Sequence, residues 1–136
     1  MHGYTPRQYT VLSINGLVHL LISACTSLQA PYYTRLAETL SIPLNQYAVV
    51  FAAYQLTSFC TATLLAKRTT NILYRRVFLI SASTVAVCYM SFLVLGHISH
   101  AGVFLMFSLF VRIIESIAAT TFFVTSQSEV ILHIKT

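Results

Sequence analysis

The amino-acid sequence predicts an all-α membrane protein with four transmembrane helices. Of its 136 residues, 57% are hydrophobic and only 8% are charged, and the mean hydropathy is +0.76. An ordinary soluble domain has about 25% charged and about 45–50% apolar residues. The few charged residues are also unevenly placed, because three long stretches lack them: 8–34, 39–66 and 77–111. This pattern argues against a soluble enzyme, a disordered tail and a disulfide-rich secreted module.

The first two stretches each fit one membrane-spanning helix. A bilayer core about 30 Å thick needs about 20 apolar helical residues, because every backbone polar group must find its partner within the segment. We therefore expect helices over about 9–30 and 45–66, joined by an external loop.

The third stretch is too long for one helix and contains a polar break. Residues 96–102 are Gly-His-Ile-Ser-His-Ala-Gly, and such a glycine-flanked polar segment is typical of a tight turn. We therefore expect helices over about 77–96 and 103–125, and the second of these contains Arg112 and Glu115.

Basic residues predict the orientation of the chain. The loop expected at 67–76 contains four of them and no acid: Lys67, Arg68, Arg75 and Arg76. Because short cytoplasmic loops carry an excess of lysine and arginine, we expect this loop and both termini in the cytoplasm. The net charge of +5 does not predict nucleic-acid binding, since long apolar stretches separate the basic residues.

The sequence contains no pattern typical of a catalytic, metal or cofactor site. It has no Cys-x-x-Cys, no His-Glu-x-x-His, no glycine-rich phosphate loop and no Gly-x-Ser-x-Gly, and its five histidines are scattered. We therefore expect neither an enzyme nor a bound cofactor. The three cysteines lie in expected helices, where we interpret them as small apolar packing residues: Cys25, Cys60 and Cys88.

Polar side chains inside the expected helices are informative because the bilayer makes them costly. One face of the first helix carries four of them, at steps of four, four and three: Asn15, His19, Ser23 and Thr26. Such a face serves either helix packing or the wall of a water-filled cavity. The larger groups Asn15 and His19, together with Gln55 in the second helix, are our candidates for a cavity wall.

Arg112 and Glu115 are the most informative polar residues of the fourth helix. An arginine or an acid at the bilayer centre costs about 2.5–3.5 kcal/mol on insertion scales. The two residues lie three positions apart, so their side chains can meet and offset part of that cost. We consider two roles: a neutralised structural pair, or a site that handles a solute or a proton, with Glu115 loading and releasing the proton.

Three local segments resemble the start of a major facilitator superfamily transporter. Residues 31–33 (Pro-Tyr-Tyr) resemble the family's proline–aromatic exit from its first helix, and residues 110–115 (Phe-Val-Arg-Ile-Ile-Glu) resemble its arginine-bearing fourth-helix motif. The loop ending in Arg75 and Arg76 sits where the family has its glycine-containing basic motif, of which this chain keeps those two arginines. The Val-Arg-x-x-acid pattern is most similar to the vesicular amine and polyamine transporter branch.

This resemblance implies a fold larger than the chain. Residues 1–136 would form a partial transmembrane domain, equivalent to the first third of a twelve-helix transporter built from two halves. The partners implied are the lipid bilayer and the remaining transporter helices or a second copy of the chain. The membrane would be vesicular or plasma membrane, and we do not expect four helices to transport alone by the family's mechanism.

The resemblance also implies a function: secondary transport of small organic cations, of the amine or polyamine class, coupled to protons. Arg112 and Glu115 would carry the charge coupling. Asn15, His19 and Gln55 would line the path of the solute or proton.

Two other functions stay open. A four-helix membrane scaffold or accessory subunit would need no buried charge beyond a packing pair. A small multidrug exporter that works as an antiparallel dimer has a similar length, but its essential acid lies in its first helix, and residues 9–30 contain no acid.

Overall fold

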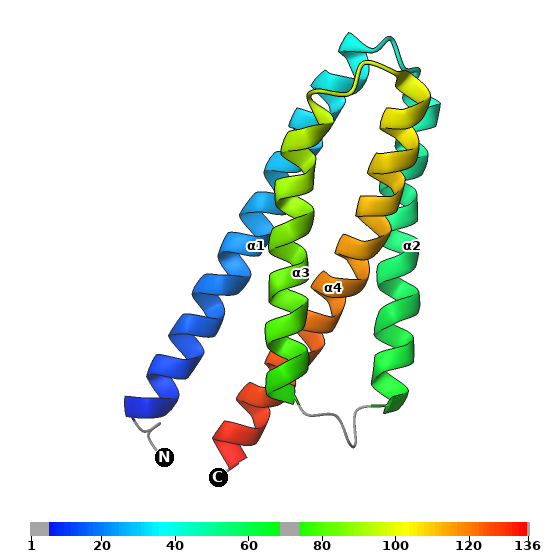
Figure 1. Cartoon of the computed structure of the whole chain (residues 1–136). Coiled ribbons are helices and arrows are strands. Elements are labelled where there is room, and N and C mark those ends of the chain that lie inside the picture. The colour runs from blue at the N-terminus through cyan, green and yellow to red at the C-terminus, as the bar shows by residue number, and fades with distance from the viewer. Residues whose placement is uncertain (1–5, 69–73, 136) are drawn as a thin grey trace.

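The computed structural model describes residues 6–68 and 74–135, which form four α-helices and, within that part of the chain, no strand. The helices are α1 (Pro6–Thr39), α2 (Leu44–Arg68), α3 (Tyr74–Leu95) and α4 (Ala101–Lys135). Each is long and apolar enough to cross a membrane, so the predicted all-α fold with four candidate spans is confirmed. The helices run alternately up and down, and both chain termini lie at the same end of the bundle (Figure 1).

α1 is longer than expected, because it continues through Pro31 to Thr39. Proline lacks the backbone N–H of a helical residue, and its ring crowds the carbonyl four residues earlier. Transmembrane helices tolerate this, and the next turn stays helical, with the Thr34 hydroxyl donating to the Ala30 carbonyl at 2.9 Å. The expected helix end just before Pro31 is therefore wrong, and the connection to α2 is short, over residues 40–43.

The turn after α1 contains a residue in the left-handed conformation. Ser41 has a φ of 55°, its N–H bonds the Glu38 carbonyl at 3.0 Å, and the Ile42 N–H bonds the Ala37 carbonyl at 3.0 Å. These two bonds define a Schellman motif, which satisfies carbonyls that a helix end leaves free. Ile42 is only 6% exposed and anchors the turn in the core.

The predicted turn between α3 and α4 is confirmed, over residues 96–100. A Cβ on Gly96 would lie 3.3 Å from the Tyr32 hydroxyl, so a larger residue here would press on α1. This turn therefore brings the end of α3 close to α1.

α4 is the centre of the bundle. It packs along both α3 and α2, whereas α1 stands at the edge and touches α4 over a shorter length (Figure 1). The buried small residues Ala118 and Ala119 let α3 approach α4 closely. α4 runs to Lys135, beyond the end expected at residue 125. Hydroxyl groups in its last turns bond back to its own carbonyls, as Ser128 does to Val124 at 2.9 Å, so they do not end the helix.

The main buried cluster lies toward the end of the bundle opposite the termini and is built around Tyr33. The Tyr33 ring is fully buried, stacks on Phe104 with 5.1 Å between centroids, and meets Phe51 edge-on at 5.5 Å. Its hydroxyl lies 2.9 Å from the Ser108 hydroxyl. Since Phe51 belongs to α2 and Phe104 to α4, this cluster fastens one end of α1 to two other helices.

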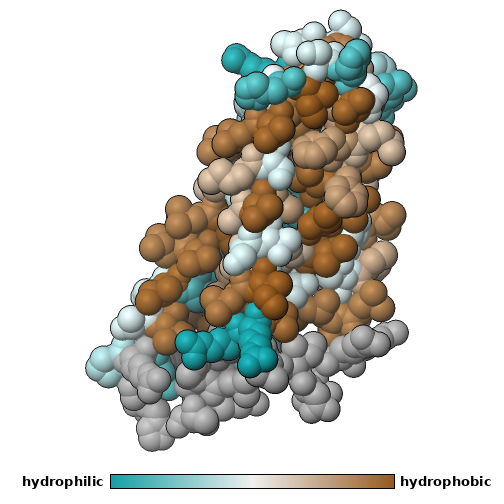
Figure 2. All heavy atoms as spheres, in the orientation of Figure 1, coloured by the Kyte–Doolittle hydropathy of each residue, from teal (hydrophilic) through white to brown (hydrophobic). Residues whose placement is uncertain are grey.

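The outer faces of the bundle are apolar. Leu28, Phe59 and Met106 are 70%, 72% and 70% exposed. Figure 2 shows apolar side chains over the middle of the visible face and hydrophilic ones gathered toward its ends. A soluble protein rarely exposes such a continuous apolar surface, so this surface indicates contact with a lipid bilayer.

Candidate functional site

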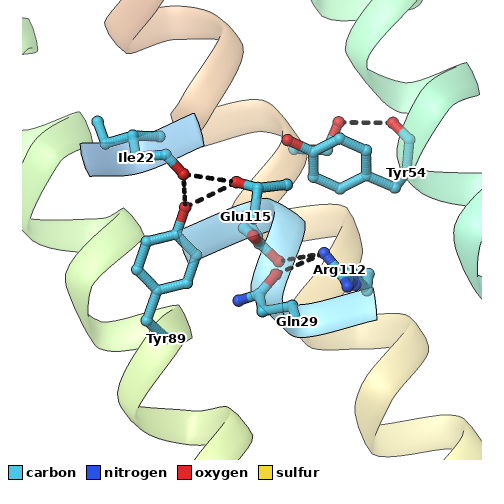
Figure 3. Close-up of polar contacts among 8 residues, drawn as sticks. Ile22, Gln29, Tyr54, Tyr89, Arg112 and Glu115 are labelled. Atoms are coloured by element: carbon cyan, nitrogen blue, oxygen red, sulfur yellow. Dashed lines mark hydrogen bonds and ion pairs between the residues drawn. The ribbon is translucent and has the colours of Figure 1, made fainter. Parts of the chain in front are cut away.

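Arg112 and Glu115 form a buried ion pair on α4. The Arg112 Nη1 lies 3.1 Å from the Glu115 Oε2, and the two residues are 2% and 0% exposed. They lie near the middle of the span Ala101–Ser128 and point into the bundle (Figure 3). The spacing of the two residues predicts that their side chains meet, and the structure shows this contact.

Gln29 of α1 joins this pair, and sequence reasoning missed it. The Arg112 Nη1 also donates to the Gln29 Oε1 at 2.7 Å, and Gln29 is 8% exposed (Figure 3). Gln29 follows Thr26 by three positions and so continues the polar face of α1, a signal that could have identified it. We call Gln29, Arg112 and Glu115 the Arg112 cluster.

Three aromatic rings surround the Arg112 guanidinium. Its Cζ lies 4.8 Å from the ring centroid of Phe92, 5.3 Å from that of Phe51 and 5.5 Å from that of Tyr54. A cation over a ring face within about 6 Å is attracted by about 2 kcal/mol or more when water is excluded. Because the rings belong to α2 and α3, and Gln29 to α1, the side chain of Arg112 contacts all three other helices.

Three atoms of the Arg112 cluster have no hydrogen-bond partner among the described residues: Gln29 Nε2, Arg112 Nε and Glu115 Oε1. Buried polar atoms nearly always have partners, and leaving one without costs about 1–3 kcal/mol, more for a charged group. The cluster therefore offers two donors and one acceptor that a proton, a water molecule or a polar solute can use.

His19 and Thr26 link α1 to its neighbours. The His19 Nε2 lies 2.6 Å from the Ser126 Oγ of α4. The hydroxyls of Thr26 and Tyr89 are 2.9 Å apart, and both lie within hydrogen-bond distance of the Ile22 carbonyl, at 2.9 and 3.2 Å. Part of the predicted polar face of α1 therefore serves helix packing.

The remaining candidates on α1 and α2 lie apart from these contacts. Asn15 is half-buried and lines a groove with Ser126. Gln55 is exposed on the outside of α2, because its neighbour Tyr54 takes the inner face, where the Tyr54 carbonyl accepts the Ser116 hydroxyl at 2.7 Å. Asn15 and His19 therefore lie on the side of α1 that faces α4, whereas Gln55 does not face the inside of the bundle.

The basic loop expected at 67–76 is shorter than predicted, because α2 runs to Arg68 and α3 begins at Tyr74. Arg75 and Arg76 are exposed in the first turn of α3, at the end of the bundle that holds both termini (Figure 1). Lys67 and Arg68 end α2, but their side chains, like residues 69–73, lie outside the described residues.

The cysteines do not share one environment. Cys88 is buried in the main cluster, whereas Cys25 and Cys60 are exposed. The packing interpretation therefore holds for Cys88, while the other two face outward. Within the described residues, no group of three or more His, Cys, Asp or Glu is placed to hold a metal ion.

By the length and apolarity of its helices, the chain is a multi-pass membrane protein. Its Arg112 cluster lies near the middle of α4, where a charged side chain is rare and marks either a pathway or a structural pair. No family model, no curated protein and no solved structure matches the chain.

Proposed function

We propose that the chain is part of a proton-coupled membrane transporter for small organic cations, in which the Arg112 cluster couples charge. The observation that supports this most is the acid Glu115, fully buried near the middle of a span and with one oxygen unpartnered. A pair that served packing alone could be replaced by apolar side chains at little cost in stability. Ionisable groups inside membrane spans typically mark ion and solute paths.

Arg112 already pairs with one oxygen of Glu115, and the other oxygen, which has no partner, can take one further partner. A proton removes its charge, and an ammonium group pairs with it. Because one carboxylate serves only one of these partners at a time, a proton and an organic cation would exchange at this site. The rings of Phe51, Tyr54 and Phe92 already surround a guanidinium, and they would attract an organic ammonium by the same interaction.

The proposal requires an assembly larger than four helices. A transporter of the major facilitator kind would hold its solute between two halves, and four helices are less than one half. α1 is the least buried of the four spans, and α2 is the next. We propose that their exposed faces pack against further transporter helices or a second copy, with the 67–76 loop and both termini in the cytoplasm.

Uptake measurements test the role of Glu115. Vesicles would contain the chain together with any sequence that follows it in its transcript, and a polyamine would be the probe. Glu115→Gln should lower uptake driven by a pH gradient by a factor of roughly 100, because the amide keeps the shape but binds no proton. Glu38→Gln, a matched change of an exposed acid on α1, should leave uptake unchanged. Full pH-driven uptake by Glu115→Gln would refute the proposal.

A non-transporting scaffold or accessory subunit is the second candidate. The observation that favours it is the tight enclosure of Arg112 by three rings and Gln29, which suits a lock between helices. In a scaffold, the double variant Arg112→Met with Glu115→Leu should keep its stability and its partners. In a transporter, the same variant should abolish uptake.

A further inference from the structure

A groove of about 190 Å³ opens between α1 and the last turns of α4, toward the end of the bundle that holds both termini. Its walls are mostly apolar and include Val18 of α1 and Phe78 of α3, but Asn15 and Ser126 interrupt them. Asn15 lies about two helical turns inside the span that begins at Gln8. The groove therefore lies at a shallow depth in the membrane.

Ser126 links its own helix to His19 of α1. The Ser126 hydroxyl, 1% exposed, can donate to the Phe123 carbonyl at 3.1 Å. Its Oγ also lies 2.6 Å from the His19 Nε2. A serine has one hydroxyl hydrogen, so Ser126 donates to one of these two partners at a time, and the His19 Nε2 donates to the Oγ or accepts from it according to its tautomer. In either case the Ser126 oxygen keeps a lone pair for another donor.

Asn15 contributes a second acceptor. Its Oδ1 is buried and has no hydrogen-bond partner among the described residues. Lipid tails and the apolar walls offer no donor, and an unpaired amide away from water is costly. A buried water needs two or more polar partners and about 30 Å³ of space. The groove provides that space and is lined by the polar residues Asn15 and Ser126, so water is the occupant that fits.

His19 closes the inner end of the groove. Its ring centroid lies 4.5 Å from that of Phe123 and 5.5 Å from that of Phe122. Further along α1, polar groups resume at the hydroxyl pair of Thr26 and Tyr89, and Tyr89 lies next to the Arg112 cluster (Figure 3). The rings of His19, Phe122 and Phe123 therefore separate the groove from the polar groups at the middle of the bundle.

We propose that this groove is a water-filled vestibule, closed at its inner end by His19, through which water and hydronium approach the Arg112 cluster. Its hydration rests on the groove alone, whereas its role in proton supply rests on the proposed function. Ser126 lies about three turns of α4 from Glu115, or roughly 16 Å. The vestibule thus shortens the dry path from the aqueous phase to the acid.

Cysteine labelling with a small, membrane-impermeant cationic thiol reagent tests the hydration. The background variant carries alanine in place of the three cysteines: Cys25, Cys60 and Cys88. Val18→Cys lines the groove, whereas Leu17→Cys lies at the same depth on the outer face, where the leucine is 58% exposed. Applied from the side of the termini, the reagent should label Val18→Cys about tenfold faster than Leu17→Cys, because thiols react as thiolates in water. Equal rates, or faster labelling from the opposite side, would overturn the vestibule.

Two further variants test the named residues. Asn15→Leu fills the groove and removes its acceptor, so it should lower the labelling of Val18→Cys to the rate of Leu17→Cys, whereas Asn15→Ser should preserve it. His19→Ala should raise the labelling of Ile22→Cys about tenfold by removing the closure. An unchanged rate in either experiment would contradict the role given to that residue.

Labelling requires no transport, so the vestibule and the proposed function can fail separately. Fast labelling of Val18→Cys without polyamine uptake would establish the vestibule and refute the transporter. Uptake that depends on Glu115 with slow labelling of Val18→Cys would mean that protons reach the acid by another route.

Discussion

Arg112 makes three kinds of contact: an ion pair with Glu115, a hydrogen bond to Gln29 and cation–π contacts with three rings. Removing each charge of such a pair from water costs several kcal/mol, and the attraction between them offsets this only with good geometry and additional hydrogen bonds. The partnerless Arg112 Nε and Glu115 Oε1 show that the offset is incomplete. The pair therefore holds a defined geometry between its two side chains but contributes little net stability to the fold.

A double-mutant cycle tests this energetic argument. Arg112→Met alone should destabilise the chain by about 3–5 kcal/mol, because it leaves the Glu115 charge buried without a partner. Adding Glu115→Leu should recover most of that loss, since no bare charge remains. The measurement is the free energy of unfolding in detergent micelles. Losses that simply add in the double variant would show that the two side chains do not act as a pair.

The pair could be predicted from the sequence, but its surroundings could not. Spacing of three along one helix is enough to bring Arg112 and Glu115 together. The rings of Phe51 and Phe92 come from other helices, and their apolar positions look like any others in the sequence. Gln29 was within reach of sequence reasoning, because it continues the polar face of α1.

At the scale of the element, α1 is held very differently along its length. At one end Tyr33 is fully buried among aromatic rings. Along the rest, three residues make hydrogen bonds to other helices, His19, Thr26 and Gln29, and the His19 ring also lies against Phe122 and Phe123. Polar contacts between membrane helices average only about 0.6 kcal/mol. The aromatic end therefore contributes most to the attachment of α1.

Substitutions at Tyr33 separate the ring from its hydroxyl. Tyr33→Phe removes the hydrogen bond to Ser108 and should cost about 0.5–1.5 kcal/mol. Tyr33→Ala also empties the aromatic cluster and should cost about 3–5 kcal/mol. Tyr32→Ala is the control, because that neighbour is 41% exposed, and should cost about 1 kcal/mol or less. Thermal unfolding in detergent would measure all three, and equal losses at both tyrosines would contradict the anchoring role.

The existence of each helix could be predicted, but two of the helix ends could not. Hydropathy along the chain is enough to identify a span. It does not show that α1 would continue through Pro31, because proline disrupts the helix interior and yet is tolerated within membrane spans. Likewise, the hydroxyl-rich end of α4 looks like a stop in sequence, yet its side chains bond their own helix.

At the scale of the whole molecule, burial is unequal among the spans. α4 is the most buried span and α1 the least, so the bundle is organised around its last helix. The outer faces of α1 and α2 are wide and apolar, and they need lipid or other helices as their surroundings.

The orientation of the bundle can be tested at its two ends. In right-side-out vesicles of the cysteine-free background, an impermeant maleimide should label His97→Cys but not Arg76→Cys, because basic loops stay in the cytoplasm. Both positions are exposed in the bundle, so packing against other helices hides neither thiol from the reagent. Labelling of Arg76→Cys and not His97→Cys would reverse the proposed topology.

The sequence by itself determined that the chain has four apolar helices, a tight turn before the last one and a charged pair within it. These are properties of length, hydropathy and spacing, which act within one segment. Only the tertiary structure decided that Arg112 would meet Gln29 and three rings, that Gln55 would face outward, and that α4 would be central. Such contacts depend on which helix faces meet, and that choice is made by the packing of all four helices together.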